Sequence, residues 1–215
     1  HRFNPTRIAF IREKIINHFN IEKDEKKPFK DIKLIDIGCG GGLLSEPMAK
    51  LGANVTGLDI VEKNIKTASA HAISQGLKIN YVHSTIEKLS EKDEKFDVIL
   101  NMEVIEHVSD VSLFINSCNK ILSPNGIMIF ASLNRTLIAY GLAIIGVEYI
   151  LGWLPKGTHD WSKFITPDEL KILFSSNGLK VDEIIGMKYN PLFDSWKRSK
   201  DLSVNYLGVS SKINS

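Results

Sequence analysis

The N-terminal residues carry apolar side chains at a helical spacing. Asn4-Pro5 combines a favourable N-cap side chain with a proline suited to the first helical position. Ile8, Ile11, Ile15 and Phe19 then recur every three or four residues, which places them on one face. The pattern therefore predicts an N-terminal amphipathic helix that packs against a core.

Short apolar runs alternate with amphipathic segments between about residues 33 and 133. This alternation indicates parallel strands joined by crossover helices that cover both faces of a sheet, with ligands bound beyond the carboxyl ends of the strands. The expected strands are Lys33–Ile37, Asn54–Leu58, Ile79–His83, Phe96–Asn101 and Gly126–Leu133, and the expected helices are Leu43–Leu51, Val61–Gln75 and Val111–Leu122.

The last third of the chain follows a different pattern. Residues 135–165 form a long insertion, and Thr166-Pro-Asp-Glu169 is a capping box that opens a helix over Pro167–Ser176. Two strand-like runs near Leu179–Met187 and Val204–Ser210 have no helix between them, which predicts an antiparallel hairpin at the sheet edge. We expect one Rossmann-like α/β domain over residues 1–215, with a seven-stranded, mostly parallel sheet.

The stretch Leu34-Ile-Asp-Ile-Gly-Cys-Gly-Gly-Gly42 indicates a nucleoside site. Gly38 and Gly40 let the backbone turn sharply and approach a ligand closely. Asp59, at the end of the next predicted strand, can accept hydrogen bonds from both ribose hydroxyls. A nicotinamide site is disfavoured because Leu43 replaces the third glycine of G-x-G-x-x-G. The G-x-G-x-G spacing instead resembles Rossmann-like S-adenosylmethionine (SAM) methyltransferases, although a glycine turn can also serve packing alone.

Charge and cysteine content narrow the partners. The chain has 27 basic and 25 acidic residues, for a net charge of +2, with no basic stripe interleaved with aromatics. This balance argues against nucleic acid as a partner. Two isolated cysteines form no disulfide framework, which suits the reducing cytoplasm.

Further stretches make the resemblance more specific. They are His1-Arg-Phe-Asn-Pro-Thr-Arg7, Met102-Glu-Val-Ile-Glu-His107, Leu122-Ser-Pro-Asn-Gly126, Ser132-Leu-Asn-Arg135 and Lys156-Gly-Thr-His-Asp-Trp-Ser-Lys-Phe164. With the glycine turn they resemble the ubiquinone biosynthesis O-methyltransferase family over essentially the whole chain. The resemblance implies SAM-dependent methylation of a polyprenyl-hydroxyphenol early in the pathway and of demethyl-ubiquinol near its end.

The resemblance also implies a set of cofactor contacts. Arg7 would pair with the methionine carboxylate of SAM, Asp59 would bind the ribose, and Met102 would pack on the adenine. A surface arginine and a core methionine are the alternative interpretations of Arg7 and Met102. The full expected set is Arg7, Asp36, Gly38, Gly40, Asp59, Ser84, Thr85 and Met102.

The acceptor chemistry points to Glu103, Glu106 and His107. A phenol titrates near pH ~10 and needs help to lose its proton at neutral pH. If this segment is helical, the three side chains share a face and can hold Mg²⁺, with a catechol completing the shell. The resemblance supports that E-x-x-E-H metal site. His107 acting as a base without metal, or a structural role, are the alternatives.

The insertion contains a long apolar run, Leu137–Leu154, with Glu148 as its only charge. Three glycines and its place inside one domain argue against a transmembrane helix. Either a buried helix over the active site or an interfacial helix fits the run. Because a polyprenyl tail resides in the bilayer, we expect a lid and a contact with anionic membrane, and a cytoplasmic protein at the inner face of the membrane.

Three other functions have different signatures. A non-catalytic SAM-binding component of a quinone-synthesis complex, with other ubiquinone-biosynthesis proteins as partners, is the main alternative. A nicotinamide oxidoreductase is disfavoured by Leu43 and the terminal hairpin. A nucleic-acid methyltransferase is disfavoured by the near-neutral charge.

Overall fold

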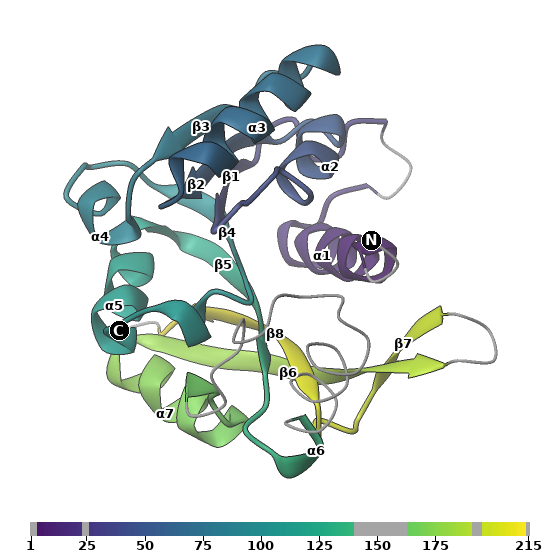
Figure 1. Cartoon of the computed structure of the whole chain (residues 1–215), viewed down its shortest axis with the longest axis vertical. Coiled ribbons are helices and arrows are strands. Elements are labelled where there is room, and N and C mark those ends of the chain that lie inside the picture. Colours follow the sequence, from purple (N-terminus) through teal and green to yellow (C-terminus); the bar gives the residue numbers. More distant parts are fainter. Residues whose placement is uncertain (1–3, 23–25, 140–162, 191–194, 214–215) are drawn as a thin grey trace.

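A single sheet runs through the parts of the chain that the computed structural model describes, which are residues 4–22, 26–139, 163–190 and 195–213. Its strand order is β3-β2-β1-β4-β5-β8-β6-β7 (Figure 1). Pairs among β1 to β5 are parallel, and β5–β8, β8–β6 and β6–β7 are antiparallel. The strands are β1 (Lys33–Ile37), β2 (Asn54–Asp59), β3 (Asn80–His83), β4 (Phe96–Met102), β5 (Leu122–Leu133), β6 (Leu179–Asn190), β7 (Ser195–Ser199) and β8 (Asn205–Lys212).

Helices cover both faces of this sheet, as the alternation predicts. In Figure 1, α1 and α2 lie on one side of the central strands, and α4, α5 and α7 lie on the other. The helices are α1 (Asn4–Phe19), α2 (Ser45–Lys50), α3 (Glu62–Ser74), α4 (Ile86–Leu89), the 3₁₀ turn η1 (Ile105–His107), α5 (Val111–Ile121), α6 (Leu137–Ala139) and α7 (Pro167–Ser176).

The central strands are buried on both faces, so they read as continuous apolar runs. In β4, Val98 and Leu100 belong to the core beneath α1 and α2, whereas Ile99 belongs to the core beneath α4, α5 and α7. Ile129 and Phe130 divide in the same way in β5. Successive side chains of each strand point to opposite faces of the sheet, and helices cover both faces. Apolar side chains are therefore favoured at every position of these strands.

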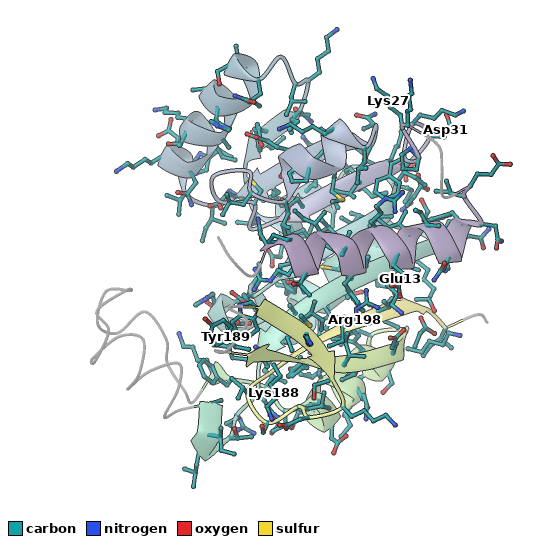
Figure 2. The ribbon with its side chains drawn as sticks, turned by 90° about the vertical axis from the view of Figure 1, so that its right-hand side faces the viewer. Glu13, Lys27, Asp31, Lys188, Tyr189 and Arg198 are labelled. Atoms are coloured by element: carbon teal, nitrogen blue, oxygen red, sulfur yellow. The ribbon has the colours of Figure 1, made fainter. Side chains whose placement is uncertain are left out.

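The N-terminal helix α1 crosses the sheet and reaches the C-terminal strands (Figure 2). Ile11 and Ile15 are fully buried, as the helical spacing predicts, and Phe10, which that spacing does not include, is fully buried as well. Glu13 forms an ion pair with Arg198 of β7 at 2.8 Å. The helix is thereby held beside residues far away in the sequence.

The expected count of seven strands is wrong, because β7 adds an eighth strand beyond the predicted hairpin. Its sequence, Ser195-Trp-Lys-Arg-Ser199, has one apolar residue and gives no strand period. Among the strands that the structure describes, β7 pairs only with β6, so it is an edge strand of this sheet. Edge strands need fewer buried side chains, which is why the apolar pattern does not reveal this one.

Several element boundaries also differ from expectation, and two of these differences have a clear physical reason. Helix α2 begins at Ser45 instead of Leu43, because the glycine turn continues through Leu44. Strand β5 begins at Leu122, and its register with β4 shifts before Ile127. Pro124, which was expected to precede the strand, therefore lies at an irregularity within it. The short helix α4 was not expected.

Most of the insertion, residues 140–162, lies outside the described residues, and with it the expected lid and interfacial helix. Of that apolar run only α6 is described, and Leu137 there is 82% exposed. None of the described helices is long and apolar enough to cross a bilayer.

Candidate active site

The glycine turn follows β1 and folds back on the end of β2. Gly38, Gly40 and Gly42 have φ values of 69°, 53° and 83°, in the left-handed region that glycine adopts without strain. The amides of Gly38 and Cys39 donate to the carbonyl of Leu58 at 2.7 and 3.0 Å. These bonds fix the turn at the carboxyl edge of the sheet, where the sequence predicts it.

Asp59 closes the other side of this turn. Its Oδ2 accepts from the amide of Gly40 at 2.9 Å, and its Oδ1 accepts from the amide of Val61 at 2.8 Å. Oδ2 also accepts from the side-chain amide of Asn64 at 3.3 Å. A carboxylate has about four acceptor positions, so the position that stays open for a ribose hydroxyl is on Oδ1. The structure therefore brings Gly38, Gly40 and Asp59 together.

Asp36 lies beneath the turn rather than at its surface. Its Oδ2 accepts from the hydroxyl of Ser45 at 2.6 Å, and the carboxyl group is buried. Burial raises the pKa of Asp36 to about 6, and the charge of Asp59 adds to the shift, while the bond from Ser45 opposes it. Asp36 thus supports the turn from β1, and Ser45 is a partner that the motif did not reveal.

Tyr81 is a second residue that the sequence reasoning missed. Its ring lies against two glycines, because a Cβ on Gly57 would come within 2.5 Å of the ring and a Cβ on Gly42 would come closer than 3.0 Å to the hydroxyl. The third glycine of the turn therefore makes room for Tyr81. The sequence did contain an indication of this contact, because a glycine inside a strand often marks a place where another group approaches the backbone closely. Gly57 is such a glycine, and it lies opposite Tyr81 in the register of β2 and β3.

Ser84 and Thr85 follow β3 beside the end of β2. The amide of Ser84 donates to the carbonyl of Asp59 at 3.2 Å. The hydroxyl of Thr85 accepts from the amide of Lys88 at 3.4 Å and caps α4. Both residues lie at the predicted edge, and the cap gives Thr85 a structural role as well.

The segment after β4 lies directly against the glycine turn. A Cβ on Gly38 would come within 2.6 Å of Cγ2 of Val104. The sequence explained Gly38 by close approach of a ligand, and the structure adds a protein neighbour on the same side. Met102, just before this segment, is almost completely buried in the core beneath α1.

Arg7 reaches this segment from α1. Its guanidinium forms an ion pair with the carboxylate of Glu103, which has a left-handed φ of 60°. The side-chain amide of Asn4, one turn earlier, donates to the carbonyl of Leu43 at 3.1 Å. The N-terminal part of α1 therefore lies beside the glycine turn, where the resemblance places Arg7.

The expected metal cradle is not assembled in this arrangement. The premise of a helix over Glu103, Glu106 and His107 is wrong, because Glu103 has a left-handed backbone and only Ile105–His107 forms a 3₁₀ turn. Glu103 is paired with Arg7, Glu106 is buried and His107 is exposed. Across the described ranges, no three His, Cys, Asp or Glu side chains lie close enough to hold a metal ion.

Glu106 is among the residues that line a pocket next to this segment. The pocket has a volume of about 580 Å³ and is lined by residues of η1, α5 and α7 and by residues 163–165. Glu106 is 3% exposed, and its Oε2 accepts from the hydroxyl of Ser132 at 3.0 Å. Burial raises the pKa of Glu106 to about 7, the charge of Glu103 adds to this, and Ser132 and Arg7 oppose it.

Solved structures with a similar fold include methyltransferases. Magnesium protoporphyrin IX methyltransferase from Synechocystis, with bound SAH, superposes with a TM-score of 0.66 and 19% identity over 97% of this chain and 83% of the other. A SAM-dependent methyltransferase from Clostridium acetobutylicum gives a TM-score of 0.69 and 15% identity over 96% and 91%. These similarities establish the fold.

Sequence relatives establish the family. Residues 35–130 match the family described as a methyltransferase domain. The ubiquinone biosynthesis O-methyltransferase of Bartonella tribocorum is 58% identical over 96% of this chain and 84% of its own length. The protein of the same name from Parvibaculum lavamentivorans is 53% identical over 99% and 84%. The chain therefore belongs to the ubiquinone biosynthesis O-methyltransferase family.

Proposed function

We propose that this SAM-dependent O-methyltransferase methylates ring hydroxyls of polyprenylated ubiquinone precursors, namely 2-polyprenyl-6-hydroxyphenol and 3-demethylubiquinol. The observation that carries the proposal is the position of the segment after β4. Val104 contacts the glycine turn, and Glu106, two residues later, is among the residues that line a mainly apolar pocket. One short segment thus connects the glycine turn with a residue that can accept a proton.

The residues around the glycine turn fit SAM. Positions where a Cβ on Gly40 or Gly41 would stand have no neighbouring atom within 4 Å, so the turn is open above these glycines. In our proposal Asp59 binds the ribose, and Arg7 pairs with the methionine carboxylate through its planar, permanently charged group. Gly38, Gly40, Ser84, Thr85 and Met102 complete the contacts, and Asp36 supports the turn. When bound, SAM supplies an activated methyl group and a good leaving group.

Glu106 is the group that we assign to proton removal. Its carboxylate accepts the proton of the ring hydroxyl as the oxygen forms its bond to the methyl carbon and the sulfur–methyl bond breaks. A base whose pKa lies near the working pH is suited to this role, and Glu106 titrates at about 7. Ser132 donates to Oε2 of this carboxylate, and in our proposal Oε1 faces the ring hydroxyl.

The Mg²⁺ that the sequence suggested does not fit the residues as they lie. Glu103 would have to leave Arg7, and Glu106 would have to be drawn out of its buried bond with Ser132. Mg²⁺ also prefers oxygen ligands over the imidazole of His107. The proposed reaction therefore uses Glu106 as the base without a metal ion, and His107 has no role in it.

We also propose that the chain works at the inner face of the membrane. An acceptor with a polyprenyl tail resides in the bilayer, and Leu137 and Ile138 expose apolar side chains on α6. Anionic lipid and other ubiquinone-biosynthesis proteins are the proposed partners. Residues 1–215 form one methyltransferase domain in this proposal, with the insertion at 135–165 as its membrane contact.

Methyl transfer to a short-tailed demethyl-ubiquinol, measured with and without EDTA, tests the proposed function. We expect transfer from SAM in both reactions, and loss of turnover with retained SAM binding in Glu106→Gln. Activity lost in EDTA and restored by Mg²⁺ would replace the base by a metal site. SAM binding without any turnover would favour the non-catalytic alternative.

A further inference from the structure

We propose that the pocket beside α7 binds the acceptor, and that Ile172 and Leu173 select acceptors that carry an apolar tail. The ligand class is a phenol or catechol with a hydrocarbon chain. Its ring hydroxyl faces Glu106, and its tail lies along α7. This inference rests on the proposed function and names the site and the residues that recognise the acceptor.

The pocket has the size and the lining of a small-molecule site. A volume of about 580 Å³ falls within the usual range for such sites. Its walls are mainly apolar, with few polar groups. The apolar lining residues are Ile105, Val108, Val111, Phe164, Ile165, Ile172 and Leu173. A phenol ring with a hydrocarbon tail buries its apolar surface well in these surroundings.

The polar groups of the pocket suit an uncharged ligand with a ring hydroxyl. Glu106 is a buried carboxyl on one wall. Arg135 and Glu169, on another wall, neutralise each other in an ion pair. Lys163, the remaining charged lining residue, is exposed to solvent. A ligand with a strong charge would meet no uncompensated buried partner here except Glu106.

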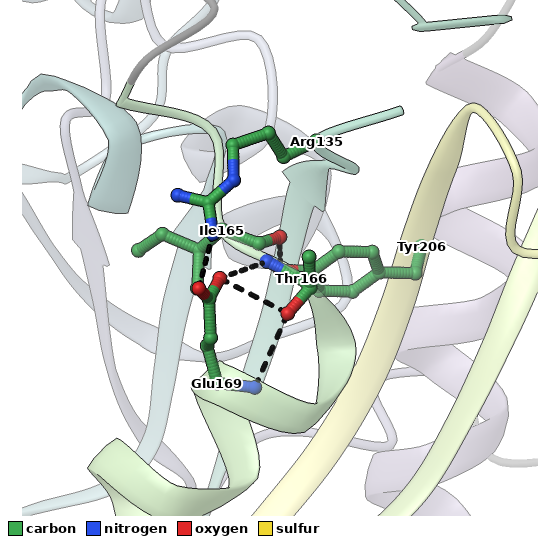
Figure 3. Close-up of polar contacts among 5 residues, drawn as sticks. All are labelled: Arg135, Ile165, Thr166, Glu169 and Tyr206. Carbon is green, nitrogen blue, oxygen red and sulfur yellow. Dashed lines mark hydrogen bonds and ion pairs between the residues drawn. The ribbon is translucent and has the colours of Figure 1, made fainter. Parts of the chain in front are cut away.

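The α7 wall is fixed in place by a local network (Figure 3). The hydroxyl of Thr166 accepts from the amide of Glu169 at 3.3 Å, and Glu169 Oε2 accepts from the amide of Thr166 at 2.9 Å. Arg135, which follows β5, pairs with the same carboxylate. The hydroxyl of Tyr206 donates to the carbonyl of Ile165 at 2.8 Å. Strands β5 and β8 thus hold the start of α7 against the pocket.

Ile172 and Leu173 continue this wall. They follow Glu169 by three and four positions, so the three side chains share one face of α7. Ile172 is 66% exposed even though it lines the pocket, which leaves a large apolar side chain for a ligand to cover. A tail that leaves the ring near Glu106 would meet this face.

Two acceptors with the same catechol ring test the inference, one with a short prenyl tail and one with a methyl group in its place. We expect Ile172→Asp to lower kcat/KM for the tailed acceptor at least about tenfold more than for the methyl acceptor, because a carboxylate replaces an apolar contact with the tail. Ile172→Trp should also change the ratio between the two acceptors, because it alters the width of the pocket.

The matched control is Ile73→Asp, since Ile73 is 76% exposed on α3 and does not line the pocket. It should leave both rates unchanged. Equal effects of the Ile172 variants on both acceptors, or no effect on either, would overturn the inference. Equilibrium dialysis of the tailed acceptor separates this failure from failure of the proposed function. Equal binding by wild type and Ile172→Asp refutes the tail site, whereas absent methyl transfer refutes the function on which it rests.

Discussion

The glycine turn and the pocket beside α7 both border the segment Glu103–Glu106, yet the chain builds them from residues in different ways. The turn is built mainly from residues 36–45 and completed by Asp59, and it is held by backbone amides and by the carboxylates of Asp36 and Asp59. The pocket collects residues from 105 to 173 and is lined by side chains. A turn built from consecutive residues has a recognisable sequence motif. A pocket lined by side chains that are far apart in the sequence has no such motif.

The same comparison distinguishes two buried carboxyl groups whose pKa values are raised. Asp36 and Glu106 both have raised pKa values because burial disfavours their charged forms. Asp36 lies beneath the turn with Ser45, and Glu106 lines a pocket with Ser132. Similar chemistry therefore supports the cofactor loop in one place and faces the proposed acceptor in the other.

The largest expected effect distinguishes the role of the pocket from that of the glycine turn. Glu106→Gln should lower kcat by about 10²–10⁴-fold, because the amide cannot accept the proton of the ring hydroxyl. Its SAM affinity should stay near that of wild type, since the cofactor side does not use this carboxylate. Steady-state kinetics and calorimetric titration with SAM measure the two quantities. A variant with wild-type kcat would show that Glu106 is not the base.

A pH comparison probes the carboxyl beneath the turn. The folded-state pKa of Asp36 is about 6 against a usual 3.8, so the unfolded chain binds fewer protons than the native protein between these values. The unfolding free energy therefore falls as pH rises from about 4 to about 6, by about 3 kcal/mol from this group. Urea unfolding of wild type and Asp36→Asn should show the difference between them change by that amount. Parallel curves for the two proteins would contradict the burial argument.

Neighbouring glycines test the packing of the turn. Gly42→Ala should destabilise the protein by about 1–3 kcal/mol, because its Cβ would collide with Tyr81 and its φ of 83° is left-handed. Gly41→Ala is the control, since its Cβ would meet no atom within 4 Å, and we expect a change below about 0.5 kcal/mol. Thermal unfolding measures both. Equal losses would mean that Tyr81 does not set the requirement for Gly42.

The smallest expected effect concerns the segment Glu103–Glu106, which borders both the glycine turn and the pocket. The SAM-free protein should bind Mn²⁺ no more tightly than about 1 mM, because Glu103 is paired with Arg7 and Glu106 is buried. Electron paramagnetic resonance of free Mn²⁺ during a titration provides the measurement. Micromolar binding that Glu103→Gln abolishes would restore the metal cradle.

Sequence patterns predicted the elements whose apolar residues recur regularly or whose caps are distinctive. They failed for elements whose structure depends on tertiary packing. Helix α1, the parallel strands and the capping box of α7 follow directly from spacing and side-chain type. Strand β7 escaped prediction because an edge strand with one apolar residue has no period. The helical premise for Glu103, Glu106 and His107 failed because spacing alone does not reveal the left-handed backbone of Glu103.

The sequence by itself determined the alternating fold, the glycine turn with Asp59, and the family, because these depend on residues close together or on a specific set of motifs. The tertiary structure decided that Tyr81 fills the space beside Gly42, that Arg7 meets Glu103, and that Glu106 lines a pocket with Ile172. Each of these contacts joins elements that the sheet topology brings together. The sequence gives the chemical type of each side chain. Which side chains become neighbours depends on how the helices pack on the two faces of the sheet.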